Sequence, residues 1–180
     1  MKKWHEYLFD IFAGHAPTPG FPPGTLENKI AIPISGTGYV VPQPPIGIEE
    51  SRDLGLCHPE LQRRYSAIKE DFKKQTGYDL FETCTWRSAK KQQEYYRHGR
   101  RGIAYEKILT NIDGITKKSR HMVFPAEAVD VCIDSDMGPG KQPIWNGVAY
   151  LPLKDLCLKH CLVWGGDWAI HDFPHIELPA

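Results

Sequence analysis

The fold of this chain is decided by the stretch AEAVDVCI at positions 126–133. Large apolar side chains occur at every second position along it, which is the pattern of a β-strand. The branched residues Val129, Val131 and Ile133 fall on one face, and Asp130 falls on the opposite face. The stretch therefore predicts a strand that carries a carboxylate within an apolar sheet.

Before this strand, the pattern predicts a helix, a strand and a second helix. Residues 59–75 carry an apolar stripe at helical spacing, with Pro59 at the start and Gly77 after the end, so a helix is expected. Residues 79–85 predict a strand. Ser88 is a suitable N-cap for a second helix, which reaches residue 97.

After this strand, residues 151–162 predict a helix and residues 174–178 predict a final strand, because proline is tolerated where a strand begins. Residues 108–110 are a candidate for one further short strand. Helices come early and strands gather late. This order is typical of an α+β domain with a small antiparallel sheet.

The first 50 residues differ in composition from the rest. Eight of the 15 prolines lie between positions 17 and 45, so this stretch is expected to be extended and rich in turns. Apolar residues within 3–13 share one helical face and predict a short amphipathic helix. We therefore expect an arm at residues 1–50, packed on a main domain at residues 51–180.

Composition argues against several classes of protein. Lys+Arg and Asp+Glu both number 22, so the net charge of zero disfavours a nucleic-acid binder that relies on bulk charge. No apolar run is long enough to span a bilayer, and no membrane insertion is expected. The five cysteines form no CxxC pair and are expected to be buried thiols. With no signal peptide expected, we predict a monomer made in the cytoplasm.

Two distant segments carry candidate metal ligands. His121 precedes the strand that holds Asp130, and His175 begins the final strand. If these strands are neighbours, the three side chains can converge on one ion. Two imidazoles and a carboxylate suit a catalytic Zn²⁺ that keeps its fourth position for water. Asp172 is a candidate general base for that water, so the set indicates metal-assisted hydrolysis.

Other side chains are candidates for contacting a substrate. Arg87 stands between an expected strand and a helix, where it could hold a carboxylate or stabilise an oxyanion, and Gln92 on that helix could reach the same cleft. The turn WGGDW at 164–168 offers Trp168 as a wall for a sugar or peptide, and His171 follows it. The structural alternatives are a surface ion pair for Arg87 and buried packing for the aromatic residues.

These motifs resemble those of a known group of enzymes. SRH at 119–121, WGGDW at 164–168 and DFPHIEL at 172–178 are similar to the motifs of zinc peptidases that cut peptidoglycan stem peptides. That group comprises D-alanyl-D-alanine carboxypeptidases and L-alanyl-D-glutamate endopeptidases, including many phage endolysins. The resemblance covers residues 55–178 and extends upstream to these pieces: PELQ at 59–62, Arg87-Ser88, Gln92 and Gly99-Arg100.

The resemblance implies an α+β fold with a small antiparallel sheet and one zinc ion. It implies His121, Asp130 and His175 as ligands. It also implies Asp172 as general base and Arg87 as the positive group at the scissile carbonyl. The remaining side chains that we expect to bind substrate are Gln92, Ser119, Trp168 and His171.

The spacing of the first two ligands departs from the family pattern. Eight residues, 122–129, separate His121 from Asp130, where the family usually has six with a central glycine. A longer loop before the strand can absorb the two extra residues. Glu127 is an alternative ligand, but strand alternation places it on the opposite face from Asp130.

The expected function is that of a zinc metallopeptidase acting on peptidoglycan stem peptides. The first hypothesis is an L-alanyl-D-glutamate endopeptidase of phage or prophage origin, which reaches the wall when a holin opens the membrane. A D-alanyl-D-alanine carboxypeptidase or dipeptidase is the second. The third is a zinc-bearing binding domain without catalysis; Asp172 favours an enzyme, because a binding domain need not keep a base.

Overall fold

The computed structural model describes residues 32–34, 38–40, 43–102, 107–135 and 142–180, in two separate units at residues 1–41 and 42–180. In the first unit, strand β1 (Ile32–Ile34) pairs antiparallel with β2 (Gly38–Val40). The helix expected at 3–13 lies outside the described residues. No described helix is long and apolar enough to cross a membrane.

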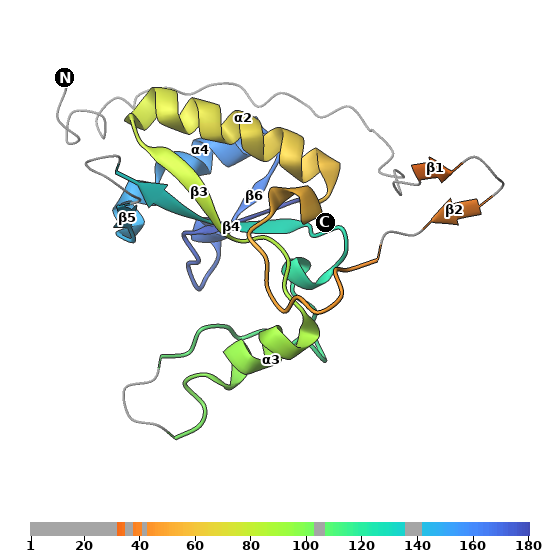
Figure 1. The fold of residues 1–180 in the computed structure, drawn as a ribbon. Coiled ribbons are helices and arrows are strands. Elements are labelled where there is room, and N and C mark those ends of the chain that lie inside the picture. The colour runs from red at the N-terminus through yellow and green to blue at the C-terminus, as the bar shows by residue number, and fades with distance from the viewer. Residues whose placement is uncertain (1–31, 35–37, 41–42, 103–106, 136–141) are drawn as a thin grey trace. The chain divides into compact units, whose positions relative to one another are not determined.

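The second unit contains a five-stranded antiparallel sheet (Figure 1). Four of the strands are hydrogen-bonded in the order β3-β4-β7-β6. The fifth, β5, pairs with β4 outside this order. The strands are β3 (Asp79–Cys84), β4 (Ala128–Asp134), β5 (Pro143–Ile144), β6 (Val163–Trp164) and β7 (His175–Glu177). This sheet with its helices confirms the expected α+β fold, and the stretch at 126–133 supplies its central strand.

Two helices pack on one face of the sheet, and a third lies on the other side of the domain (Figure 1). Helices α2 (Pro59–Thr76) and α4 (Pro152–Lys159) contact each other, and α2 also contacts β3. Helix α3 (Ala89–Arg97) begins at Ser88, whose side chain accepts a hydrogen bond from the backbone N–H of Lys91. The core thus lies between the sheet and the α2–α4 pair.

The core residues follow the expected periodicity. Helix α2 buries one apolar stripe, and Gly77 ends it in the left-handed conformation with φ of 80°. Both faces of β4 are buried, so this strand forms the centre of the domain. The following large side chains are fully buried between the layers: Leu61, Tyr65, Ile68, Phe72, Val129, Val131, Ile133 and Leu153.

The structure differs from the expected elements in its short pieces. No strand forms at 108–110, and the helix expected over 151–162 ends at Lys159. Four 3₁₀ helices were not expected: η1 (Leu54–Leu56), η2 (Arg120–Met122), η3 (Gly147–Tyr150) and η4 (Gly165–Asp167). Such single turns depend on tertiary contacts more than on local sequence pattern.

Candidate metal centre

The register of the sheet brings the candidate ligands together. Asp130 on β4 is directly paired with His175, the first residue of β7. On the other side of β4, Asp130 is paired with Cys84, the last residue of β3. His121 reaches the same place from η2, the turn that precedes β4. Three neighbouring strands and one turn therefore converge at a single point.

The donor atoms of His121, Asp130 and His175 lie close to one another. His121 Nε2 is 3.2 Å from Asp130 Oδ1 and 3.3 Å from His175 Nδ1. His175 Nδ1 is 2.9 Å from the same Asp130 oxygen. Ligands placed about 2.0–2.1 Å from a tetrahedral zinc ion are separated by about 3.3 Å. The residues present therefore fit such an ion with little movement.

In each imidazole, one nitrogen makes a hydrogen bond within the protein, and the other nitrogen is then free to bind a metal ion. His121 Nδ1 lies 2.8 Å from the carbonyl oxygen of Thr85, which only accepts hydrogen bonds, so Nδ1 carries the proton. His175 Nε2 lies 3.0 Å from Glu177 Oε2 and donates to that carboxylate. In the neutral rings, His121 Nε2 and His175 Nδ1 then present lone pairs to Asp130. This arrangement is that of metal-binding histidines.

Charged groups around the cluster shift the pKa values of His175 and Asp130. Burial disfavours a charged His175, but hydrogen bonds to Asp130 and Glu177 outweigh this cost and raise the pKa of His175 to about 10. Burial of Asp130 is likewise outweighed by the charge and hydrogen bond of His121, which hold the pKa of this carboxyl well below its usual range. The cluster therefore favours a positive charge between Asp130 and the imidazoles.

Cys84 forms a second candidate group with two of these residues, and the sequence patterns did not predict it as a ligand. One donor atom each from Cys84, His121 and Asp130 lie within 4.8 Å of one another, so the three could hold a metal ion. However, Cys84 Sγ lies 3.8 Å from His121 Nδ1, the nitrogen already committed to Thr85. Burial also raises the pKa of the Cys84 thiol, which disfavours the thiolate that metals bind. The geometry favours His175 as the third ligand.

Asp172 lies in the tight turn that enters β7. Its backbone N–H donates to Gly165, and its carbonyl accepts from the N–H of His175 at 3.1 Å. A side chain at Gly165 would lie 2.6 Å from that carbonyl, so glycine is needed for this close approach. The Asp172 side chain is exposed, yet protein surrounds it closely enough that desolvation, followed by the Asp130 charge, raises its pKa. The Asp172 carboxyl therefore lies close enough to Asp130 to be affected by its charge.

Arg87 is buried against the cluster and not on the surface. Its Nη2 lies 3.4 Å from Asp130 Oδ2 and 3.2 Å from Cys84 Sγ. Its Nη1 donates to Gln92 Oε1 at 3.1 Å, and its Nε donates to Glu50 at 3.1 Å. The guanidinium therefore uses most of its five donors within the protein. The surface ion pair considered for Arg87 does not describe this position.

The remaining predicted residues occupy different places around the cluster. The Trp168 ring centre is 4.9 Å from that of His175, and 36% of Trp168 is exposed. Ser119 is buried and caps η2 by accepting from the N–H of His121. His171 Nδ1 lies 2.7 Å from the Gly166 carbonyl. Trp168 is thus the predicted substrate contact that borders the metal ligands most openly.

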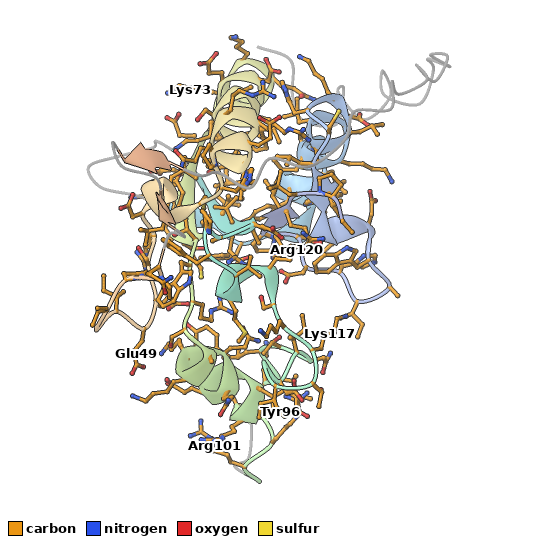
Figure 2. The ribbon with its side chains drawn as sticks, turned by 90° about the vertical axis from the view of Figure 1, so that its right-hand side faces the viewer. Glu49, Lys73, Tyr96, Arg101, Lys117 and Arg120 are labelled. Carbon is orange, nitrogen blue, oxygen red and sulfur yellow. The ribbon has the colours of Figure 1, made fainter. Side chains whose placement is uncertain are left out.

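Glu127 belongs to a network of ion pairs that also includes Glu177, the partner of His175. Arg120 Nη1 lies 2.6 Å from Glu127, and its Nε lies 3.4 Å from Glu177, the partner of His175. Figure 2 shows Arg120 between the sheet and α3. Glu127 is therefore an ion-pair partner in this network. Its alternative role as a ligand finds no support among the donor atoms that converge on Asp130.

Comparison with known proteins finds only distant likenesses, all of them among solved structures. No protein-family model and no curated protein sequence matches this chain. Among solved structures, the L-Ala D-Glu endopeptidase ChiX of Serratia marcescens aligns with a TM-score of 0.49 and 22% identity. The alignment covers 70% of this chain and 83% of that protein. This similarity is too distant to transfer an activity.

Proposed function

We propose that this chain is a zinc-dependent peptidase that hydrolyses peptide bonds in peptidoglycan stem peptides. One observation carries the proposal: two imidazole lone pairs and a carboxylate oxygen converge within 3.3 Å, with a second carboxylate at the entrance to β7. The resemblance of the sequence motifs to peptidoglycan peptidases supports the substrate class. His121, Asp130 and His175 are the proposed ligands of one Zn²⁺.

When bound, the zinc ion supplies an acidified water and polarises the scissile carbonyl. Asp172 is the proposed general base, since a carboxylate with a raised pKa is a better proton acceptor. It takes a proton on its side-chain oxygen and later gives that proton to the leaving amine. Arg87 is the proposed positive group that balances the charge of the tetrahedral intermediate.

The substrate is proposed to bind beside β7. Trp168 offers an aromatic wall next to His175, and His171 follows in the same loop. Gln92 and Ser119 are also proposed for substrate binding. Both are buried, and Gln92 donates to the Ile112 carbonyl at 2.7 Å while it accepts from Arg87. These contacts suit residues that shape the site.

We further propose that the scissile bond lies between L-alanine and D-glutamate, and that the enzyme acts as a phage or prophage endolysin. It would then be made in the cytoplasm and meet the wall after a holin opens the membrane. The sequence motifs support both the scissile bond and the biological role in this proposal.

The test is mass spectrometry of purified peptidoglycan digested with the protein, with and without a chelator. A new amino-terminal D-glutamate and a new carboxyl-terminal L-alanine, both absent with chelator, are expected. Release of single D-alanine would replace this proposal with a carboxypeptidase. No cleavage of several wall types by the zinc-loaded protein would favour a zinc-bearing binding domain.

A further inference from the structure

A short segment before η1 lies alongside the chain that carries Arg87. The N–H of Ser51 donates to the Trp86 carbonyl at 2.9 Å, and the N–H of Ser88 donates to the Glu49 carbonyl at 2.8 Å. Between these bonds, Glu50 is paired antiparallel with Arg87. The backbone therefore fixes Glu50 directly opposite Arg87.

Both carboxylate oxygens of Glu50 are used to hold this arrangement. Oε1 accepts from Arg87 Nε at 3.1 Å, and Oε2 accepts from the Tyr95 hydroxyl at 2.8 Å. The Tyr95 ring lies 4.5 Å from the centre of the Arg87 guanidinium, in a cation–π contact. One edge and one face of the guanidinium are thus fixed by Glu50 and Tyr95.

A different nitrogen of the guanidinium, Nη2, faces the candidate metal centre. Arg87 Nη2 contacts Asp130 Oδ2, while Asp130 Oδ1 faces the two histidines. Arg87 therefore contacts two carboxylates, those of Glu50 and Asp130. If the Glu50 charge were absent, the buried cation of Arg87 would lie beside a candidate ligand of a divalent metal ion. The repulsion between this cation and the metal ion would be only weakly screened.

We infer that Glu50 is a positioning residue of the metal centre that acts through Arg87. It orients the guanidinium toward Asp130 Oδ2 and neutralises its charge, so Asp130 keeps its full negative charge for the metal ion. This inference rests on the proposed zinc site. Glu50 lies before residues 55–178, which carry the sequence resemblance, so the motifs did not indicate it.

The test compares the zinc affinity of Glu50→Gln with that of the unchanged full chain, by competition with a chromophoric chelator. Loss of an outer-shell partner typically weakens metal binding by roughly 10–100-fold, and a loss in this range is expected. Glu49→Gln is the matched control, because Glu49 lies in the same segment but pairs with exposed Lys90 (Figure 2 shows Glu49 near α3). Its affinity should not change.

A double-substitution cycle separates this role from a general loss of structure. In an Arg87→Met background, Glu50→Gln should have little further effect on zinc affinity, because the connecting residue is gone. Equal losses in both backgrounds would overturn the inference, as would unchanged affinity in folded Glu50→Gln. If Glu50→Gln does not fold, Tyr95→Phe should still give a smaller loss in the same direction, and unchanged affinity there would overturn it.

The same experiment distinguishes the two proposals. If the unchanged chain binds no zinc, the proposed metal centre fails, and this inference fails with it. If the unchanged chain binds zinc tightly and folded Glu50→Gln binds it equally well, only the role of Glu50 is rejected. The cobalt-loaded protein gives a second readout, since its visible spectrum should change in Glu50→Gln and not in Glu49→Gln.

Discussion

At His175, a proton and a metal ion compete for the same nitrogen. The pKa of this ring is raised from 6.5 to about 10, so His175 is protonated at pH 7.5 when only protein charges act on it. Zinc binds neutral imidazole, so binding at this pH should release about one proton. Calorimetry in buffers of different ionisation enthalpy measures this number. A binding enthalpy that does not depend on the buffer would contradict the prediction.

The raised pKa of His175 also determines how the stability of the metal-free protein depends on pH. A pKa raised in the folded state means that the charged ring stabilises the metal-free protein, fully below pH 6.5 and less as pH rises toward 10. Zinc affinity should rise over this window. Glu177→Gln removes one of the two carboxylates that raise the pKa of His175, so it should reduce the proton release and serves as a comparison.

Asp172 is expected to be essential for turnover and dispensable for metal binding. Asp172→Asn removes the proton acceptor, and loss of a general base costs roughly 10²–10⁴-fold in kcat. Zinc content should stay at one ion per chain, because Asp172 is not a proposed ligand. Peptide cleavage assays together with zinc analysis check both parts. Asp167→Asn, in the preceding turn and paired with Lys154, is the control and should keep activity.

At the residue scale, the sequence indicated which candidate ligands converge, but it did not indicate the residues that support them. Asp130 and His175 stand at recognisable strand positions, and the structure brings them together with His121. Cys84 reaches Asp130 through a register shift between Glu82 and Cys84, which no local pattern reveals. Glu50 depends on a pairing across 37 residues of chain. Long-range pairing is therefore the information that one sequence lacks.

At the element scale, the end of α4 contains an unfavourable residue in a regular motif. The N–H of Leu162 bonds to the Cys157 carbonyl, and that of Cys161 bonds to the Leu158 carbonyl, as in a Schellman ending. Cys161 occupies its left-handed position with φ of 55°. Glycine adopts this conformation freely, whereas most other residues are strained there.

Cys161→Gly should therefore stabilise the protein. Relief of the left-handed strain outweighs the greater flexibility of glycine in the unfolded chain, and a net gain of about 0.5–1 kcal/mol in the free energy of unfolding is expected. The expectation that all five cysteines are buried is wrong for Cys161, which is exposed beyond the end of α4, so its thiol contributes little packing that would be lost. Urea denaturation measures the change. Cys161→Ala keeps the strain and should give no gain; an equal gain would reject this explanation.

The long elements could be predicted from their own sequence pattern, whereas a strand as short as β6 could not. Helix α2 and strand β4 carry their own periodicity over many residues, and both form within one or two residues of the expected positions. Strand β6 has two residues and pairs with β7. Elements that short have too few positions for a period to appear, so their existence is decided by tertiary contacts.

At the scale of the whole molecule, the position of the boundary between arm and domain decides which of the two contains Glu50. The sequence predicts an arm at residues 1–50, whereas contacts divide the chain after residue 41. Residues 49–51 pair with the segment around Arg87, so they contribute to the main domain. A boundary drawn from proline content thus assigns Glu50 to the arm, because composition does not register backbone pairing.

Two truncations separate the arm from this segment. We expect the arm to pack on the domain, so deletion of residues 1–45 should lower the melting temperature and activity, and unchanged values would reject that packing. Zinc affinity should survive this deletion, because Glu50 and its pairing remain.

Deletion of residues 1–51 removes Glu50 as well and should weaken zinc binding by a further factor, roughly 10–100-fold for a lost outer-shell partner. Chelator competition on both truncated chains measures this difference. Equal zinc affinity in the two would mean that the segment at 49–51 does not support the metal centre.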